Sequence, residues 1–306
     1  MDKFADIEAF TAVVEAGAFS AAGERLGVAK SVVSRRVSQL ERRLGSRLLH
    51  RTTRRLALTD TGKNFYQRAV QILADLDDAE QSVSEETMEL RGSLKLAAPL
   101  SFGLGHLSNA ITDFLNKHPA IDLNLDLNDR NINLVEEGFD MAVRIGDLQD
   151  STLVARRLGT IRNITCASRG YLEQHGAPAS PDDLHQHVGL QYSNINYKQQ
   201  WCYETPEGKI VYAQPQIRIR ANNGEALAAA AIAGLGITTG PTFILGKHIK
   251  EGNLVTVLNE YQRHSVGIFA VYPPGRLIPR RIQVFSEFLA ERFGDRPYWD
   301  NDLHTP

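Results

Sequence analysis

Residues 19–62 constrain the fold more strongly than any other part of the 306-residue sequence. Two short segments with helical periodicity meet there at a turn, and the second segment has an apolar face opposite a polar, basic face. Between Lys30 and Arg55 there are nine lysines or arginines and one acid, Glu41. The whole chain has a net charge of −2, so this positive charge is local. A helix pair with a locally basic surface indicates a polyanionic partner, of which DNA fits best.

The charge of the chain is divided unevenly along its length. Residues 1–62 have a net charge of +4, residues 63–90 have a net charge of −5, and the remainder is close to neutral. Such segregation indicates a nucleic-acid module joined to another domain. The length suffices for two or three domains with their own cores, and 42% hydrophobic and 23% charged residues are typical of a soluble globular protein.

The sequence contains no targeting signal, disulfide pattern or metal-binding pattern that indicates a function. The first residues contain no apolar signal core and the sequence has no apolar run of about 18 residues, so we expect a cytoplasmic protein without a membrane segment. Cys166 and Cys202 have no metal-ligand spacing. Two inert thiols are the favoured interpretation, and a redox pair is the alternative. His185 and His187 lack a carboxylate pattern nearby, and the sequence predicts neither a cofactor nor a metal site.

Two helices are predicted ahead of the basic helix. The first spans about 4–15, with an apolar stripe three and four residues apart, and Gly17 ends it. The second is short and runs through Leu26, with Ser20 as its expected N-cap.

The third predicted helix spans about 30–44 and ends at Gly45. Its expected core face comprises Val33, Val37, Leu40 and Leu44. Its opposite stripe comprises Ser31, Ser34, Arg35 and Ser38. Small hydroxyl residues allow close approach to base edges and phosphates, and an arginine can bind a guanine or a phosphate through two N–H groups. The stripe therefore predicts a recognition helix, although the solvated face of an ordinary helix is the alternative.

Residues 51–59 change to strand-like alternation at Leu56 and Leu58, which predicts a small two-stranded wing. Arginines in this wing would reach phosphates or the minor groove. The predicted DNA contacts are Ser20, Lys30, Ser31, Val32, Ser34, Arg35, Arg36, Ser38, Arg51, Arg54 and Arg55.

Residues 63–90 predict one long helix with an acidic outer face. Its apolar positions alternate four and three apart, as in a coiled-coil seam: Phe65, Ala69, Ile72, Leu76, Ala79 and Val83. Because one such helix cannot bury its own seam, we expect it to pair with a second copy of the chain. The alternative is that it packs on its own domain.

The remainder of the chain alternates strand and helix patterns after a hinge at Arg91–Ser93. Strands are predicted at about 94–99, 121–127, 140–146, 165–168 and 237–240, and helices at about 104–118 and 226–233. This alternation predicts an open α/β architecture.

The N-terminal third resembles the LysR-type transcriptional regulators. The resemblance rests on an ordered set of motifs: Phe10, Glu15–Ala22, Leu26–Val28, Ser31–Arg35, Leu40–Glu41, Leu44–Gly45, Leu48–Leu49, Arg51, Arg54 and Leu58–Gly62. It extends through the helix that follows and, more weakly, to the C-terminus. Ala29-Lys30 stands where the family often has Ser-Gln, and Leu48-Leu49 where Leu-Phe is common. Lys30 adds a charge at the start of the recognition helix, so its base preference is expected to differ.

The resemblance implies a winged helix-turn-helix, a dimerising linker helix and a two-lobed α/β effector domain similar to periplasmic binding proteins. The implied domains are 1–59, 60–90 and 91–306, with lobe I at about 91–163 and 268–306 and lobe II at about 164–267. The implied partners are double-stranded promoter DNA, a second copy bound through the linker helix in a homodimer that assembles into a homotetramer, and a small-molecule effector between the lobes. No membrane partner is expected.

The family places its effector between the two lobes, where two opposed helix N-termini would favour a small anion such as a carboxylate. The residues carried over by local pattern are Ser101, Phe102, Asn128, Arg144, Gly146, Ser168, Asn223 and Gly224. The alternative is that these residues are ordinary caps and turns.

Other classes of function remain open at this stage. For an enzyme, the sequence contains no G-x-S-x-G, P-loop or H-E-x-x-H motif, and we expect no catalysis. A DNA-binding regulator without a ligand is the first alternative. A non-catalytic small-molecule-binding protein is the second, and a transport receptor would be expected to carry an export signal.

Overall fold

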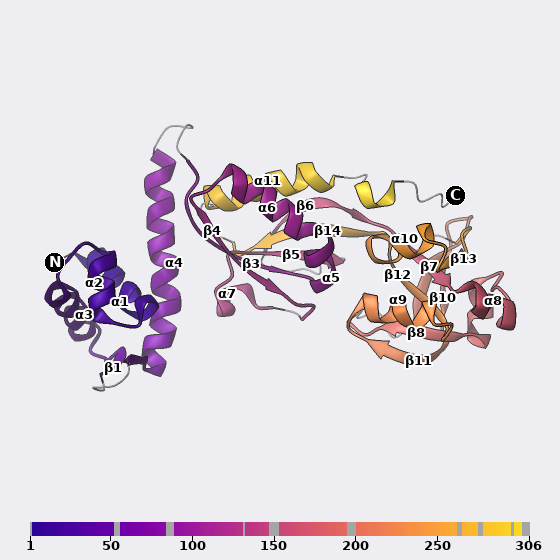
Figure 1. Ribbon diagram of the computed structural model, residues 1–306, viewed down its shortest axis with the longest axis horizontal. Helices are drawn as coiled ribbons and strands as arrows, with labels where there is room; N and C mark the ends of the chain where they lie inside the picture. Colours follow the sequence, from indigo (N-terminus) through magenta and orange to yellow (C-terminus); the bar gives the residue numbers. More distant parts are fainter. Residues whose placement is uncertain are drawn as a thin grey trace. The chain divides into compact units, whose positions relative to one another are not determined.

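The computed structural model describes residues 2–51, 56–83, 89–130, 132–146, 153–194, 200–261, 265–274, 278–294 and 297–301. Its internal contacts divide the chain into two compact units, residues 1–93 (unit 1) and 94–306 (unit 2) (Figure 1). Of the predicted site residues, Arg54 and Arg55 lie outside the described residues. Among the described helices, none combines the length and apolar character needed to cross a membrane.

Unit 1 begins with three helices: α1 Lys3–Ala16, α2 Phe19–Arg25 and α3 Lys30–Leu44. Asp2 accepts hydrogen bonds from two backbone N–H groups at the start of α1. Gly17 and Gly45 adopt the left-handed conformation that ends α1 and α3, as the sequence predicts. The predicted cap of α2 is wrong, because that helix begins one residue before Ser20 and its N-cap, Ala18, makes no side-chain hydrogen bond.

The three helices enclose an apolar core. Phe10, Val33 and Leu40 are fully buried, which confirms the predicted inner face of α3 for most of its length. Leu44 is the exception, with 41% of its surface exposed, because the last turn of α3 extends beyond the core. The ring of Phe10 lies 5.7 Å from that of Phe65, which fixes the following helix against this core.

The predicted wing has two antiparallel strands, β1 Leu49–Arg51 and β2 Leu56–Leu58. The Glu41 carboxylate accepts hydrogen bonds from the backbone N–H groups of Leu48 and Leu49, so the only acid in the basic stretch joins α3 to the wing. Nothing is described for the side chain of Arg51.

The long helix α4 spans Asp60–Val83 and so begins before the predicted position 63. The Thr59 hydroxyl accepts a hydrogen bond from the Gly62 N–H at 2.8 Å, which caps its first turn. Ala69 is fully buried in the core of unit 1, so the predicted seam packs partly on its own domain. Ile72 is 41% exposed and Leu76 is half-buried. The side chains of the last two seam residues, Ala79 and Val83, lie outside the described residues.

Unit 2 is built around two five-stranded sheets, which confirms the α/β prediction. The sheet of lobe I has the order β4-β3-β5-β14-β6. Its strands are β3 Gly92–Ala98, β4 Ile121–Leu127, β5 Met141–Gly146, β6 Val154–Ile161 and β14 Val266–Tyr272. Its helices are α5 Leu100–Phe102, the π-helix η1 Gly103–Leu107, α6 Ser108–Lys117, α7 Leu134–Glu137 and α11 Arg280–Phe293. The predicted helix near 104–118 is therefore two segments, η1 and α6, and Leu104, predicted on its apolar stripe, is 65% exposed.

The sheet of lobe II has the order β11-β8-β12-β7-β13. Its strands are β7 Asn163–Ala167, β8 Val188–Tyr192, β11 Gln216–Ala221, β12 Ile237–Pro241 and β13 Val255–Val257. Around it lie α8 Arg169–His175, the 3₁₀ turn η2 Pro181–Gln186, the hairpin of β9 Trp201–Glu204 with β10 Ile210–Ala213, α9 Gly224–Ile232 and α10 Thr242–Lys250. A last 3₁₀ turn, η3 Tyr298–Asp300, contacts α10.

The chain passes from the first sheet to the second after Ile161 and returns before Val266. At the first crossing the Arg162 carbonyl accepts a hydrogen bond from the Thr242 N–H. In lobe I, β3 and β5 run parallel, and the Asn128 N–H donates to the Ala98 carbonyl at the end of β3. The carboxyl ends of these strands therefore meet at one edge of the sheet, where α/β proteins commonly bind ligands.

Candidate functional site: the outer face of α3 and the lobe boundary

The outer face of α3 is the first candidate site. Lys30, Ser31 and Arg35 are exposed there, and Ser34 is half-buried. In the part of the chain that the structure describes, these four side chains have no hydrogen-bond or ion-pair partner. Val32 and Ser38 are half-buried on the same helix, and Ser20 is exposed on α2. The face therefore presents donors and a positive charge that no described part of unit 1 satisfies.

A close turn fixes the position of α3. The Gly23 carbonyl accepts a hydrogen bond from the Val28 N–H, and a Cβ atom added at Gly23 would lie 2.7 Å from the Val28 carbonyl oxygen. Only glycine fits at such an approach. This contact holds α2 against the start of α3, so the outer face of α3 is preformed.

Arg36 differs from the other predicted DNA contacts. Its guanidinium donates to the Ala5 carbonyl of α1 at 3.4 Å. Arg43 lies two helical turns further along α3 and forms an ion pair with the buried Asp6 of α1. These arginines join two helices of unit 1, and the structure does not place Arg36 on the same face as Arg35.

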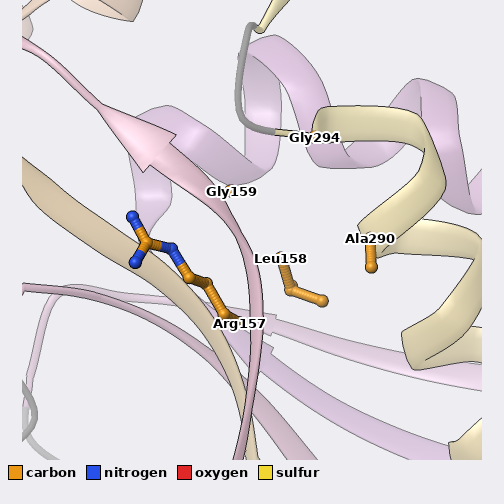
Figure 2. Close-up of a pocket in the computed structure, with 5 residues that line it drawn as sticks. All are labelled: Arg157, Leu158, Gly159, Ala290 and Gly294. Atoms are coloured by element: carbon orange, nitrogen blue, oxygen red, sulfur yellow. The ribbon is translucent and has the colours of Figure 1, made fainter.

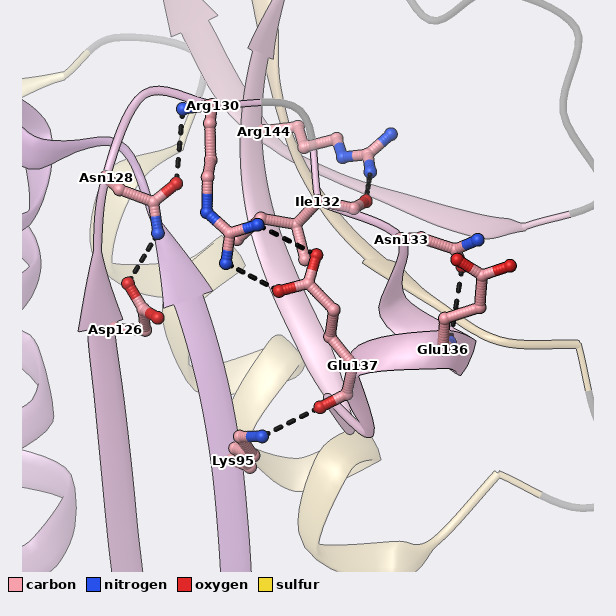
Figure 3. Close-up of polar contacts among 9 residues, drawn as sticks. All are labelled: Lys95, Asp126, Asn128, Arg130, Ile132, Asn133, Glu136, Glu137 and Arg144. Carbon is pink, nitrogen blue, oxygen red and sulfur yellow. Dashed lines mark hydrogen bonds and ion pairs between the residues drawn. The ribbon is translucent and has the colours of Figure 1, made fainter. Parts of the chain in front are cut away.

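The second candidate site is the boundary between the two lobes, and several polar side chains gather at its lobe I edge (Figure 3). Asn128 donates to the Asp126 carboxylate and accepts from the Arg130 N–H. Arg130 in turn forms a two-pronged ion pair with Glu137. These contacts hold Asn128 in a polar turn directly after β4.

Arg144 lies at the same edge, on β5, and donates to the Ile132 carbonyl at 2.7 Å (Figure 3). Burial lowers the pKa of its guanidinium. Among the described residues it has no carboxylate partner. A half-buried cation without an anion is a candidate binding group.

Ser101 and Asn223 come from different lobes and are brought together by the fold. The Asn223 side-chain oxygen caps α9 by accepting from the Ala226 N–H, and its amide nitrogen donates to the Ser101 hydroxyl at 3.4 Å. At the start of α5, the Leu100 N–H donates to the Asp129 carboxylate. The N-termini of α5 and α9, which the sequence predicts as anion sites, therefore each have a backbone N–H that is already bonded to a side chain.

The remaining predicted effector residues have roles in packing or in the backbone. The Phe102 side chain is fully buried among aromatic rings of both lobes and the C-terminal turn: His106, Phe243, Phe293 and Trp299. Ser168 is buried and caps α8. A Cβ atom at Gly224 would lie 2.6 Å from an Ile244 methyl group, so this glycine allows α9 to approach α10. Gly146 ends β5 with a positive φ of 140°.

Sequence reasoning missed three residues of the lobe boundary: Asp129, Tyr192 and Asn194. The Asn194 side chain donates to the Asp129 carbonyl at 2.9 Å, and it does so from the other lobe. Burial and the nearby Asp129 charge raise the pKa of Tyr192 to about 12. Asp129 directly follows the predicted Asn128, so the sequence offers a signal for it. Tyr192 ends β8 and Asn194 follows it, and the sequence does not predict this strand.

A pocket of about 300 Å³ lies elsewhere in lobe I, between β6 and α11 (Figure 2). It is lined by Arg157, Leu158, Gly159, Ala290 and Gly294. The Arg157 guanidinium donates to the Thr160 hydroxyl. No predicted effector residue lines this pocket.

The two cysteines lie in lobe II and differ in burial. Cys166 is fully buried, and burial raises the pKa of its thiol to about 12, so it stays protonated at neutral pH. Cys202 is half-buried on β9. Within the described ranges, no three His, Cys, Asp or Glu side chains are grouped as a metal site requires.

Comparisons with known proteins match both units. Residues 4–63 match the family described as bacterial regulatory helix-turn-helix protein, lysR family, and residues 88–294 match the LysR substrate binding domain. The chain is 39% identical over 290 residues to an HTH-type transcriptional regulator of Haemophilus influenzae, covering 94% of this chain and 99% of that protein. It is 35% identical to the HTH-type transcriptional regulator CrgA of Neisseria meningitidis serogroup C, covering 95% and 97%.

Solved structures give the same result. The CrgA structure from Neisseria meningitidis covers 95% of this chain and 99% of its own, with 33% identity and a TM-score of 0.60. The full-length structure of the Vibrio cholerae virulence activator AphB covers 95% and 99%, with 27% identity and a TM-score of 0.58.

Proposed function

Because the chain belongs to the LysR family of transcriptional regulators, we propose that it binds promoter DNA through α3 and responds to a small molecule held at the lobe boundary. The observation that carries the proposal is the outer face of α3, where Lys30, Ser31 and Arg35 have no partner among the described residues. The chain acts by binding and not by catalysis, and it acts in the cytoplasm.

The DNA contacts follow from the geometry of α3. Its N-terminal turns enter the major groove, where Arg35 binds a guanine or a phosphate and the hydroxyl groups of Ser31 and Ser34 approach base edges. Arg51 and the other wing arginines bind phosphates. Arg36 contributes by holding α3 against α1 and not by touching DNA.

The proposed assembly is a homodimer formed through α4, and two dimers form the tetramer. Support comes from Ile72, an apolar side chain of the predicted seam of α4 that remains 41% exposed in the single chain. Pairing of α4 helices would bury it and place two copies of α3 on two half-sites of DNA. In domain terms, we propose that residues 1–59 read DNA, 60–90 pair the chains and 91–306 hold the effector.

The proposed effector carries an acidic group. Support for this class is Arg144, whose half-buried guanidinium lacks a carboxylate partner in the described structure. Ser101, Asn128 and Asn223 already take part in hydrogen bonds at the lobe boundary, and an effector would exchange these for its own. The effector acts by favouring one arrangement of the lobes over another, which is a shift between two populations.

The test of the proposed function is a promoter-binding assay with Arg35→Ala at fixed salt concentration. Loss of a base or phosphate contact is expected to weaken binding by about 1–3 kcal/mol, which is roughly 5- to 150-fold. The matched control is Arg42→Ala, because Arg42 is exposed on the last turn of the same helix and the change removes the same charge.

The two variants separate a specific contact from a general effect of charge. A loss confined to Arg35→Ala supports the outer face of α3 as the recognition surface. Equal losses in both variants, or unchanged affinity in Arg35→Ala, would show that α3 does not read the DNA in this way.

A further inference from the structure

Asp129 is held from both sides of the lobe boundary. It follows β4, and its carboxylate accepts a hydrogen bond from the Leu100 N–H at 3.1 Å, within lobe I. Its backbone carbonyl accepts from the Asn194 side chain of lobe II. Asp129 therefore lies at the lobe boundary, with its carbonyl bonded to lobe II and its carboxylate bonded to the first backbone N–H of α5.

The negative charge of Asp129 is not compensated within the described structure. A carboxylate can accept about four hydrogen bonds, and only the one from Leu100 is present among the described residues. The neighbouring Arg130 is engaged by Glu137. Among the described residues, no cation is paired with Asp129. Partial burial raises the pKa of Asp129, and its charge contributes to the raised pKa of Tyr192.

We propose that Asp129 determines the specificity of the lobe boundary by accepting a hydrogen bond from an ammonium group of the effector. The effector then carries a cationic donor in addition to the acidic group proposed for Arg144, as an amino acid does. A simple monocarboxylate is disfavoured, because at the Leu100 amide it meets a carboxylate of the same charge. This inference rests on the proposed function, since it concerns the same lobe boundary.

The test uses three small probes on the full-length protein: methylammonium chloride, tetramethylammonium chloride and sodium acetate, each titrated at constant ionic strength. The thermal unfolding midpoint gives an apparent affinity for each probe. We expect methylammonium to bind about tenfold or more tightly than either other probe, because a hydrogen bond to a charged group contributes at least this factor to binding. Tetramethylammonium has the same charge but no N–H donor, so it separates hydrogen bonding from charge alone.

Two variants complete the test. Asp129→Asn removes the charge but keeps a side-chain oxygen for the Leu100 N–H, so the fold is expected to survive, and the preference for methylammonium is expected to disappear. Asp122→Asn makes the same change at an exposed position of β4 and is expected to behave as the wild type.

Three results would overturn the proposal: no stabilisation of the wild type by methylammonium, equal stabilisation by acetate or tetramethylammonium, or an unchanged response in Asp129→Asn. Promoter binding by the Arg35→Ala and Arg42→Ala variants is measured without any probe. Failure of the ammonium preference is therefore distinguishable from failure of DNA recognition.

Discussion

Unit 1 leaves faces of its helices without partners, whereas unit 2 joins its functional polar groups to one another. On α3, Lys30 and Arg35 extend from a dry core and have no described partner. At the lobe boundary, Asn223 is bonded to Ser101 and Asn194 to Asp129. A DNA duplex therefore meets a surface that is already formed. In the proposed function, an effector exchanges existing hydrogen bonds between the lobes, which would couple its binding to a change in their arrangement.

The largest expected effect concerns the exposed apolar seam of α4 in unit 1. Ile72→Asp places a charge on the exposed seam of α4, and a symmetric dimer meets it twice. At about 1.5 kcal/mol or more for each buried isoleucine, the dimer dissociation constant should rise by about a hundredfold. Light scattering across a concentration series measures the change.

The matched control is Asn64→Asp, which adds the same charge at another exposed position of α4. It is expected to leave the dimer intact. A dimer that survives Ile72→Asp would mean that unit 1 has no apolar face to share and that the chains pair elsewhere.

A smaller effect tests the hydrogen bond that joins the two lobes of unit 2 at Asn223 and Ser101. Asn223→Ala removes both the cap of α9 and the bridge to Ser101, and loss of such a cap costs about 1 kcal/mol. Ser101→Ala removes only the bridge and should cost less. Urea unfolding followed by tryptophan fluorescence is specific to this unit, because both tryptophans, Trp201 and Trp299, lie in it.

The double variant shows whether the two residues act together. If the bridge is present, the combined cost is smaller than the sum of the single costs, because either change alone breaks it. Strictly additive costs would contradict a hydrogen bond between Asn223 and Ser101.

The smallest effect concerns pH. His106 of η1 contacts the Tyr298 hydroxyl at 2.6 Å, and burial lowers its pKa below the ordinary 6.5. Its neutral form is favoured in the fold, so stability is full above about pH 6.5 and falls as the pH drops below that value. The tryptophan signal should therefore show an acid loss in unit 2 that is weaker in His106→Gln.

His187 sets the background for this measurement, because burial also lowers its pKa and part of the acid loss should remain in the variant. His185→Gln changes an exposed histidine of the same unit and serves as the control. An identical pH profile for His106→Gln and the wild type would contradict a role for His106 in joining the aromatic cluster.

Local signals account for what could be predicted in unit 1. The bounds of α3 follow from its apolar spacing and from Gly45, both of which act within a few residues. Ser20 and Leu44 were misassigned for one shared reason: burial depends on where the rest of the unit ends. Phe19 packs on the core and brings the start of α2 forward, and the last turn of α3 extends past that core.

Long-range pairing explains the misses in unit 2. The strands β6 and β14 are antiparallel partners more than a hundred residues apart, and their side chains do not alternate in a pattern that reveals this pairing. Among the effector residues, the sequence identified the polar positions Ser101, Asn128, Arg144 and Asn223. It did not reveal that Phe102 is buried in an aromatic cluster or that Asp129 occupies the Leu100 amide.

The sequence by itself determined the family, the helix-turn-helix and the basic face of α3, because spacing, glycine punctuation and local charge act over short stretches of chain. The tertiary structure alone decided which polar groups remain without partners. Arg36 donates to a carbonyl of α1, the start of the α4 seam packs in the core of its own unit, and the Asp129 carbonyl accepts a hydrogen bond from the other lobe. Each of these outcomes depends on which distant backbone lies within hydrogen-bond or van der Waals distance, and that is fixed only when the whole chain has packed.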